Sequence, residues 1–141
     1  MKSNLYINEV RIDKEIPRDN YLRKLSVVRN LRRMGGLRFH KNVTFLVGEN
    51  GVGKSTLIEG ITVADASDVP DGVHAGIGKT GFKFIISTHS PILMTFPDAE
   101  VMEITEEGIR SVNYKDTEHF VVTKRFMDAP EKIVENLLGD N

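Results

Sequence analysis

The chain has 141 residues, of which 40% are hydrophobic and 28% are charged, and its formal net charge is -1. This length corresponds to about one domain, and the composition is that of a globular chain, which excludes a multidomain assembly and whole-chain disorder. The sequence contains no cysteine and 4 scattered histidines, so disulfides and cysteine-ligated metals are excluded and metal chemistry would need oxygen ligands.

The first half of the chain predicts alternating strands and helices. Residues 5–12 predict a strand, and residues 22–31 predict a helix with a basic outer face that ends at Gly35-Gly36. Residues 37–39 predict a short strand, and the β-branched and aromatic run 43–47 predicts another that ends in a glycine loop. A further helix is predicted to begin at Gly53 or Lys54 and to continue through Ile61.

The second half begins with residues 65–81, which lack any hydrophobic period and predict a loop or linker. Residues 82–87 predict a buried strand, and Ser90-Pro91 predicts the start of a short helix that runs to Phe96. Residues 101–104 and 109–114 predict a hairpin.

Two helices are predicted to close the chain. The first begins after Asp116, and the second begins at Asp128 or Ala129 and stops at Gly139. The second helix is expected to turn its apolar residues inward, namely Ile133, Val134, Leu137 and Leu138.

No apolar run approaches the roughly 20 residues that span a bilayer, and the N-terminal residues lack a secretory signal pattern. We therefore expect a cytoplasmic protein with no membrane segment. Residues 18–41 hold many Lys and Arg residues and a single acid, Asp19. A solvated helix face is the simpler interpretation of this basic segment, and nucleic acid binding through residues 18–41 is kept as a hypothesis.

One segment carries a phosphate-binding pattern. Gly48-Glu49-Asn50-Gly51-Val52-Gly53-Lys54-Ser55-Thr56 fits G-x-x-x-x-G-K-[ST], follows a predicted strand and opens a predicted helix. The glycines allow successive backbone N–H groups to turn inward as an anion nest, and the helix presents its positive N-terminal end. We therefore expect this P-loop to bind the polyphosphate of a nucleotide.

Each polar residue at the start of the predicted helix has an expected role. Lys54 would contact the β- and γ-phosphates as a point charge, and the Ser55 hydroxyl would be a ligand of Mg²⁺. Thr56 would support the α-phosphate. For the adenine ring, Tyr21 and His40 are candidate stacking partners, although ordinary packing or exposure is the simpler interpretation of both residues.

His89 is placed at the tip of a predicted strand, at the edge where open α/β sheets bind ligands. By itself, a histidine in this position is more often a hydrogen-bonded packing residue. Taken together, the P-loop and Thr88-His89-Ser90-Pro91 resemble the ABC-type ATPases, and more closely the AAA family of stand-alone ATPases related to the chromosome-maintenance and DNA-repair branch. The tail segment Asp116-Thr117-Glu118-His119 is similar to the stand-alone type.

The resemblance implies ATP and Mg²⁺ as cofactors and a catalytic role for His89 as the switch histidine that contacts the γ-phosphate. It also implies a Q-loop glutamine, a signature loop and an apolar strand ending in Asp-Glu between the two motifs. Only 35 positions separate Lys54 from His89 (89 minus 54), and the chain contains no glutamine. We therefore expect this chain to lack the Q-loop, the signature loop and the Walker B strand that ends in Asp-Glu. Relatives form head-to-tail dimers through the signature loop, so a homodimer of that kind could not close here.

The sequence thus predicts an α/β fold: a shortened, ABC-ATPase-like P-loop NTPase core sheet with a C-terminal β-hairpin and helices. Residues 1–141 would form a single nucleotide-binding domain in which residues 65–81 replace the usual helical lobe. The expected function is ATP binding with ancestral ATP hydrolysis, and turnover by this chain is left open. The alternatives are a non-catalytic nucleotide-binding or interaction module, with a homodimer or another protein as partner, and a P-loop kinase.

Overall fold

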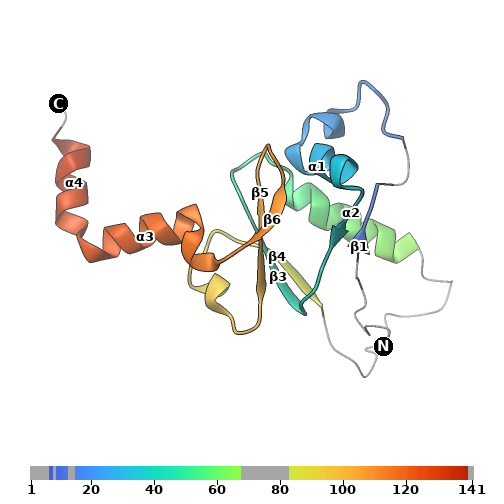
Figure 1. Cartoon of the computed structure of the whole chain (residues 1–141). Coiled ribbons are helices and arrows are strands. Elements are labelled where there is room, and N and C mark those ends of the chain that lie inside the picture. The colour runs from blue at the N-terminus through green and yellow to red at the C-terminus, as the bar shows by residue number, and fades with distance from the viewer. Residues whose placement is uncertain (1–6, 8, 13–14, 68–82, 140–141) are drawn as a thin grey trace.

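The computed structural model describes residues 7, 9–12, 15–67 and 83–139, and its centre is a four-stranded sheet with the order β4-β3-β5-β6 (Figure 1). The strands are β3 (Val43–Val47), β4 (Phe84–Ser87), β5 (Glu100–Ile104) and β6 (Ile109–Val112). Strand β3 pairs in parallel with both β4 and β5, and β5 pairs antiparallel with β6. Strands β1 (Glu9–Val10) and β2 (Leu37–Arg38) form a separate antiparallel pair.

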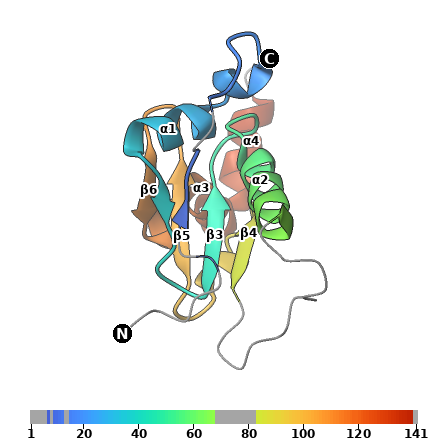
Figure 2. The same cartoon turned by 90° about the vertical axis from the view of Figure 1, so that its right-hand side faces the viewer.

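The helices lie on both sides of this sheet. They are α1 (Ser26–Met34), α2 (Lys54–Ser67), α3 (Glu118–Asp128) and α4 (Pro130–Leu138), with short 3-10 turns at Tyr21–Lys24, Leu93–Thr95 and Tyr114–Asp116. Figures 1 and 2 show α1 and α2 on one side of the sheet and α3 and α4 on the other. Among the described residues, no helix is long and apolar enough to cross a membrane.

Strand β3 is buried because it lies between β4 and β5 and because side chains pack against both of its faces. Leu46 belongs to the core cluster that also contains residues of α1 and α2, such as Leu31 and Leu57. Phe45 and Val47 point to the opposite side and pack with Met94 and Val101. The mixed sheet with helices on both sides confirms the predicted α/β fold class.

The helix predicted over residues 22–31 is interrupted. Leu25 is extended, with φ −70° and ψ 132°, and separates the 3-10 turn Tyr21–Lys24 from α1. An apolar residue at every third position fits the three residues per turn of a 3-10 helix as well as an α-helix, so the spacing could not show the break. The strand predicted over residues 5–12 is reduced to β1 within the described residues.

The loop predicted over residues 65–81 is wrong in its start, because α2 continues to Ser67. Two alanines near this end favour the helix, and residues 68–82 lie outside the described part of the chain. The buried strand predicted over residues 82–87 is wrong in its burial: β4 is an edge strand, and Phe84 is 52% exposed. The short helix predicted after Ser90-Pro91 is only a 3-10 turn, in which the Ser90 hydroxyl accepts a hydrogen bond from the Leu93 N–H at 3.3 Å.

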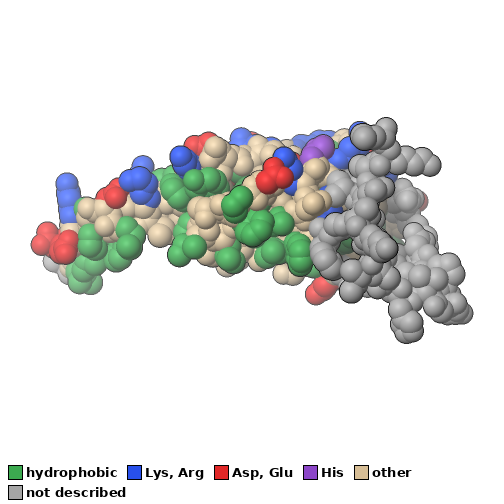
Figure 3. All heavy atoms as spheres, turned by 90° about the horizontal axis from the view of Figure 1, so that it is seen from below, with side chains coloured by type: hydrophobic (Ala, Val, Ile, Leu, Met, Phe, Trp, Pro, Cys, Tyr) green, Lys and Arg blue, Asp and Glu red, His purple; other side chains and the backbone are tan. Residues whose placement is uncertain are grey.

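Helices α3 and α4 form an arm that leaves the core (Figure 1). Pro130 opens α4, as predicted, and the Gly139 N–H closes it on the Glu135 carbonyl. The prediction of an inward apolar face is wrong, because Leu137 and Leu138 are 76% and 72% exposed. The apolar residues of α4 do recur at helical spacing, but the arm carries their common face away from the core. Figure 3 shows hydrophobic side chains gathered along the arm.

Candidate functional site

Three loops follow the carboxyl ends of the parallel strands and therefore meet at one edge of the sheet. The glycine-rich loop 48–53 follows β3, Thr88-His89 follows β4, and the turn 105–108 follows β5. Open α/β sheets bind ligands at this edge. The pairing of β3 with β4 is what brings the two sequence motifs together.

The glycine-rich loop depends on glycine for two close approaches. At Gly48, with φ +144°, a Cβ would stand 2.4 Å from the Ile104 carbonyl oxygen at the end of β5. At Gly53, with φ +100°, a Cβ would stand 2.4 Å from Cγ1 of Val27 in α1. The loop is thus pressed between a neighbouring strand and a helix, in backbone conformations that side chains rarely adopt.

Lys54, the first residue of α2, turns back into this loop. Its ammonium group donates hydrogen bonds to the carbonyls of Gly48 at 2.6 Å and of Glu49 at 2.8 Å. The residue is only 7% exposed, and this burial lowers the pKa of the Lys54 ammonium. The loop therefore closes around a positive charge at the N-terminal end of a helix, which is the arrangement that attracts an anion.

Helix α1 supports the loop from outside. The Val27 N–H donates a hydrogen bond to the Val52 carbonyl at 2.9 Å, so the first turn of α1 is tied to the loop backbone. Val52 is buried in the same core cluster as Val27. Glu49, Asn50 and Gly51 form the exposed crest of the loop.

Ser55 and Thr56 occupy the first turn of α2 beside Lys54, where Ser55 is exposed and Thr56 is half-buried. The described residues contain no group of three or more His, Cys, Asp or Glu side chains that could hold a metal ion. These residues fit Mg²⁺ only if the ion is held by the Ser55 hydroxyl together with water and phosphate oxygens. Mg²⁺ commonly binds with few protein ligands in this way.

His89 has a partner that the sequence did not indicate. Its Nδ1 lies 2.6 Å from Nε2 of His119, a residue of the first turn of α3. The rings meet edge to face, with centroids 4.5 Å apart and an interplanar angle of 89°. Desolvation is the main cause that lowers the pKa of His89, and the charges of His119 and Lys54 lower it further.

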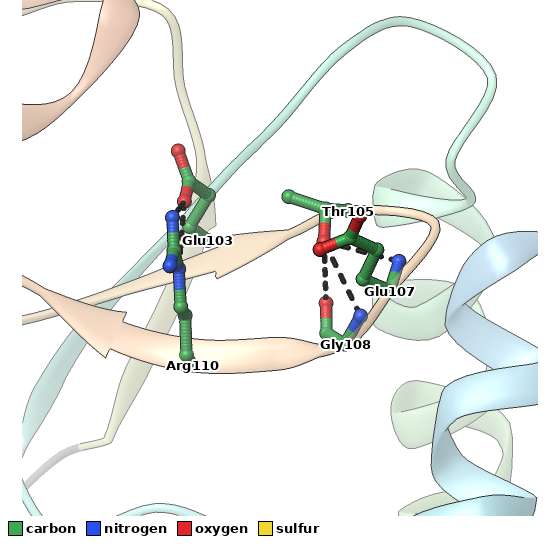
Figure 4. A network of polar contacts seen from close by, with 5 residues as sticks. All are labelled: Glu103, Thr105, Glu107, Gly108 and Arg110. Atoms are coloured by element: carbon green, nitrogen blue, oxygen red, sulfur yellow. Dashed lines mark hydrogen bonds and ion pairs between the residues drawn. The ribbon is translucent and has the colours of Figure 1, made fainter.

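A cavity of about 620 Å³ opens beside the glycine-rich loop and is lined by Gly48, Glu49, the turn 105–108 and His119, among others. Figure 4 shows polar contacts among five of the residues that line this cavity. Glu103 of β5 pairs with Arg110 of β6 at 2.7 Å, and the Thr105 hydroxyl accepts hydrogen bonds from the N–H groups of Glu107 and Gly108, both at 3.2 Å. The volume lies within the range of small-molecule sites.

The hairpin turn is also anchored to α1. The buried Asn30 donates from its amide nitrogen to the Thr105 carbonyl at 2.7 Å. Its amide oxygen accepts a hydrogen bond from Arg33 at 3.1 Å. Helix α1 therefore supports two of the three loops at this edge, the glycine-rich loop and the hairpin turn.

His40, a candidate for stacking on the base, lies away from this edge. His40 precedes β3 and contacts Glu100 at the start of β5, with 3.3 Å between Nδ1 and the carboxylate. It therefore belongs to the opposite end of these strands and cannot stack on a base held at the glycine-rich loop. Tyr21 is 67% exposed. The basic side chains of residues 18–41 are exposed except for the half-buried Arg23, and nucleic acid binding by them stays a prediction.

The glycine-rich loop, its buried lysine and the helix that follows define a nucleotide-binding P-loop protein of mixed α/β fold. The family described as the AAA domain matches residues 24–136. The chain belongs to this family.

A GTPase HflX from Caldanaerobacter subterraneus subsp. tengcongensis is 30% identical to this chain over 129 residues. The match covers 84% of this chain and 30% of that relative, so the chain spans under a third of the relative's length. No solved structure matches the chain significantly.

Proposed function

We propose that this protein is an ATP-binding member of the ABC-type branch of P-loop ATPases and that residues Gly48–Thr56 hold the triphosphate. The observation that carries the proposal is the position of Lys54. Its ammonium already donates to the Gly48 and Glu49 carbonyls, at 2.6 and 2.8 Å, inside the loop. Phosphate oxygens would replace these neutral acceptors with charged ones, and hydrogen bonds to charged groups are the stronger kind.

We assign roles at the triphosphate to Ser55, Thr56 and His89 as well. The Ser55 hydroxyl would hold Mg²⁺ together with phosphate oxygens, and this ion would neutralise charge on the phosphates. Thr56 would contact the α-phosphate. His89 would contact the γ-phosphate, since its strand β4 lies directly beside the strand that leads into the P-loop.

ATP is proposed rather than GTP, although the matched relative is a GTPase. The segment Asn113-Tyr114-Lys115-Asp116 has the wrong order for the Asn-Lys-x-Asp pattern that recognises guanine. The Asn113 side chain accepts a hydrogen bond from the Lys115 N–H at 3.0 Å and so caps a 3-10 turn. This capping role accounts for Asn113 without a base.

Rapid turnover is not part of the proposal. Phosphoryl transfer needs a carboxylate for the metal and a polar group to orient water. The sequence between Lys54 and His89 contains no Asp-Glu pair. We therefore propose binding with slow hydrolysis or none. The single domain over residues 1–141, the replacement of a helical lobe at 65–81 and a cytoplasmic location stay predictions.

The test is a titration with a fluorescent ATP analogue and Mg²⁺, in wild type, Lys54→Ala and the control Lys83→Ala. Lys83 is a useful control for Lys54, because it also donates to a backbone carbonyl (Phe39, 3.1 Å) and its pKa is also lowered by burial, although it is only half-buried. It precedes β4 and so lies at the opposite end of this strand from His89.

Lys54→Ala is expected to weaken binding at least tenfold, because a charge-assisted hydrogen bond contributes about 1.5–3 kcal/mol and tenfold corresponds to about 1.4 kcal/mol. Lys83→Ala should bind as wild type does. Equal affinity of wild type and Lys54→Ala would contradict the proposal, and tighter binding of a fluorescent GTP analogue would contradict the choice of ATP. Phosphate release that depends on Mg²⁺ and Lys54 would favour the enzyme over the binding module.

A further inference from the structure

The contact between His89 and His119 joins two segments that are 30 positions apart. A threonine hydroxyl fixes the backbone near each histidine. The Thr88 hydroxyl accepts from the Ser90 N–H at 3.0 Å, and Thr117, which is 1% exposed, caps α3 by accepting from the Phe120 N–H at 3.4 Å. Local hydrogen bonds therefore order the backbone near both histidines, whose rings approach to 2.6 Å.

A contact between two ring nitrogens at this distance requires one donor and one acceptor. A neutral imidazole carries a single N–H, so there are two arrangements of the pair. If His89 donates from Nδ1, its Nε2 is left as an acceptor. If His119 donates from Nε2, the proton of His89 is on Nε2, and His89 keeps a donor on the side of the ring away from His119.

A phosphate oxygen accepts hydrogen bonds and does not donate them when it is ionised, so only the second arrangement suits a phosphate contact. The surroundings of His89 favour the neutral ring. Desolvation, His119 and the Lys54 ammonium all lower the pKa of His89. A neutral ring can offer a donor at Nε2 only in one of its two tautomers, and the partner at Nδ1 decides which one is present.

We propose that His119 is a positioning residue that donates from Nε2 to Nδ1 of His89 and thereby holds His89 in the tautomer that donates from Nε2 to the γ-phosphate. This inference rests on the proposed function. Since ADP lacks the γ-phosphate, the His119 hydrogen bond acts on the preference for ATP over ADP.

Two substitutions of His119 separate hydrogen bonding from packing. His119→Gln keeps a side-chain N–H donor and loses the ring, whereas His119→Phe keeps the edge-to-face ring contact and loses the donor. We expect His119→Phe to lower the ratio of ATP to ADP affinity, because His89 loses the partner that favours the tautomer donating from Nε2. The loss should be smaller than the loss of about tenfold expected for His89→Phe, which removes the hydrogen bond to the charged acceptor itself. His119→Gln should stay within about twofold of wild type.

The measurements are equilibrium titrations of each variant with ATP and with ADP, both with Mg²⁺. If His119→Phe retains the preference and His119→Gln loses it, the contact is one of packing and the inference is overturned. Equal ratios in all variants overturn it as well.

The tautomer can be read without nucleotide, from the ¹⁵N chemical shifts of the His89 ring in the wild-type protein near pH 8. A protonated Nε2 and an unprotonated Nδ1 are expected, and a protonated Nδ1 in wild type would overturn the inference. In His119→Phe the preference for this tautomer should weaken, and an unchanged spectrum in this variant would also overturn the inference. A wild-type protein that shows the expected tautomer but binds no ATP would contradict the proposed function and leave the positioning of His89 intact.

Discussion

Substitution of Gly53 by alanine tests whether contact with α1 shapes the P-loop. Gly53 and Gly51 both have positive φ angles, +100° and +87°, so an alanine at either position is strained by about 1–3 kcal/mol. The two positions differ in their surroundings. A Cβ at Gly53 would meet Cγ1 of Val27 at 2.4 Å, whereas a Cβ at Gly51 has nothing within 4 Å. Overpacking adds about 1–3 kcal/mol at Gly53 alone.

We expect Gly53→Ala to lower the free energy of unfolding by about 1–3 kcal/mol more than Gly51→Ala does. Urea unfolding of both variants measures this difference, provided that the slope of the transition is unchanged. Combining Gly53→Ala with Val27→Ala should recover most of the excess in a double-mutant cycle, since the clash needs both side chains. Equal costs at Gly51 and Gly53, with no coupling to Val27, would refute the close packing of α1 on the loop.

Three further outcomes follow from single contacts. Asn30→Ala removes the donor to the Thr105 carbonyl and should cost about 1–3 kcal/mol in urea unfolding, because a partly buried acceptor loses its partner. Leu137→Lys, at a position 76% exposed, should change the stability by less than about 0.5 kcal/mol, and a larger loss would show that the arm packs on the core. The pKa of His89 is lowered in the folded state, so the unfolded chain binds more protons near pH 6.5, the ordinary pKa. The contribution of His89 to the free energy of unfolding is therefore present above that pH and is lost as the pH falls. Unfolding curves of His89→Phe should therefore show a smaller loss between about pH 7 and 5 than wild type.

Much of the fold could be predicted because its signals are local. The β-branched run of β3, the glycines of the P-loop and the hairpin of β5 and β6 each carry a turn or period that fixes their own conformation. The break at Leu25 was missed because a spacing of three residues fits two kinds of helix. The exposed stripe of α4 was misplaced because amphipathic spacing shows which residues share a face but not whether a core lies opposite them.

Some features of the candidate site were also predictable from local sequence, and others were not. The spacing of Gly48, Gly53, Lys54 and Ser55 predicted the glycine-rich loop and the helix that follows it, because the pattern reflects local backbone geometry. The parallel pairing of β3 with β4 decided that His89 lies at the same edge, and the path of the chain into α3 decided that His119 meets it at 2.6 Å. His119 had no local signal beyond its place in the segment Asp116-Thr117-Glu118-His119.

The sequence by itself thus determined the class of the protein and the position of its glycine-rich loop, since both depend on residues adjacent along the chain. Only the tertiary structure decided that Lys54 is buried against the Gly48 and Glu49 carbonyls, that α1 supports the loop through Val27, and that two distant histidines share one contact. These features arise from packing between segments that are far apart in sequence, and no periodicity or motif within one segment encodes the position of another.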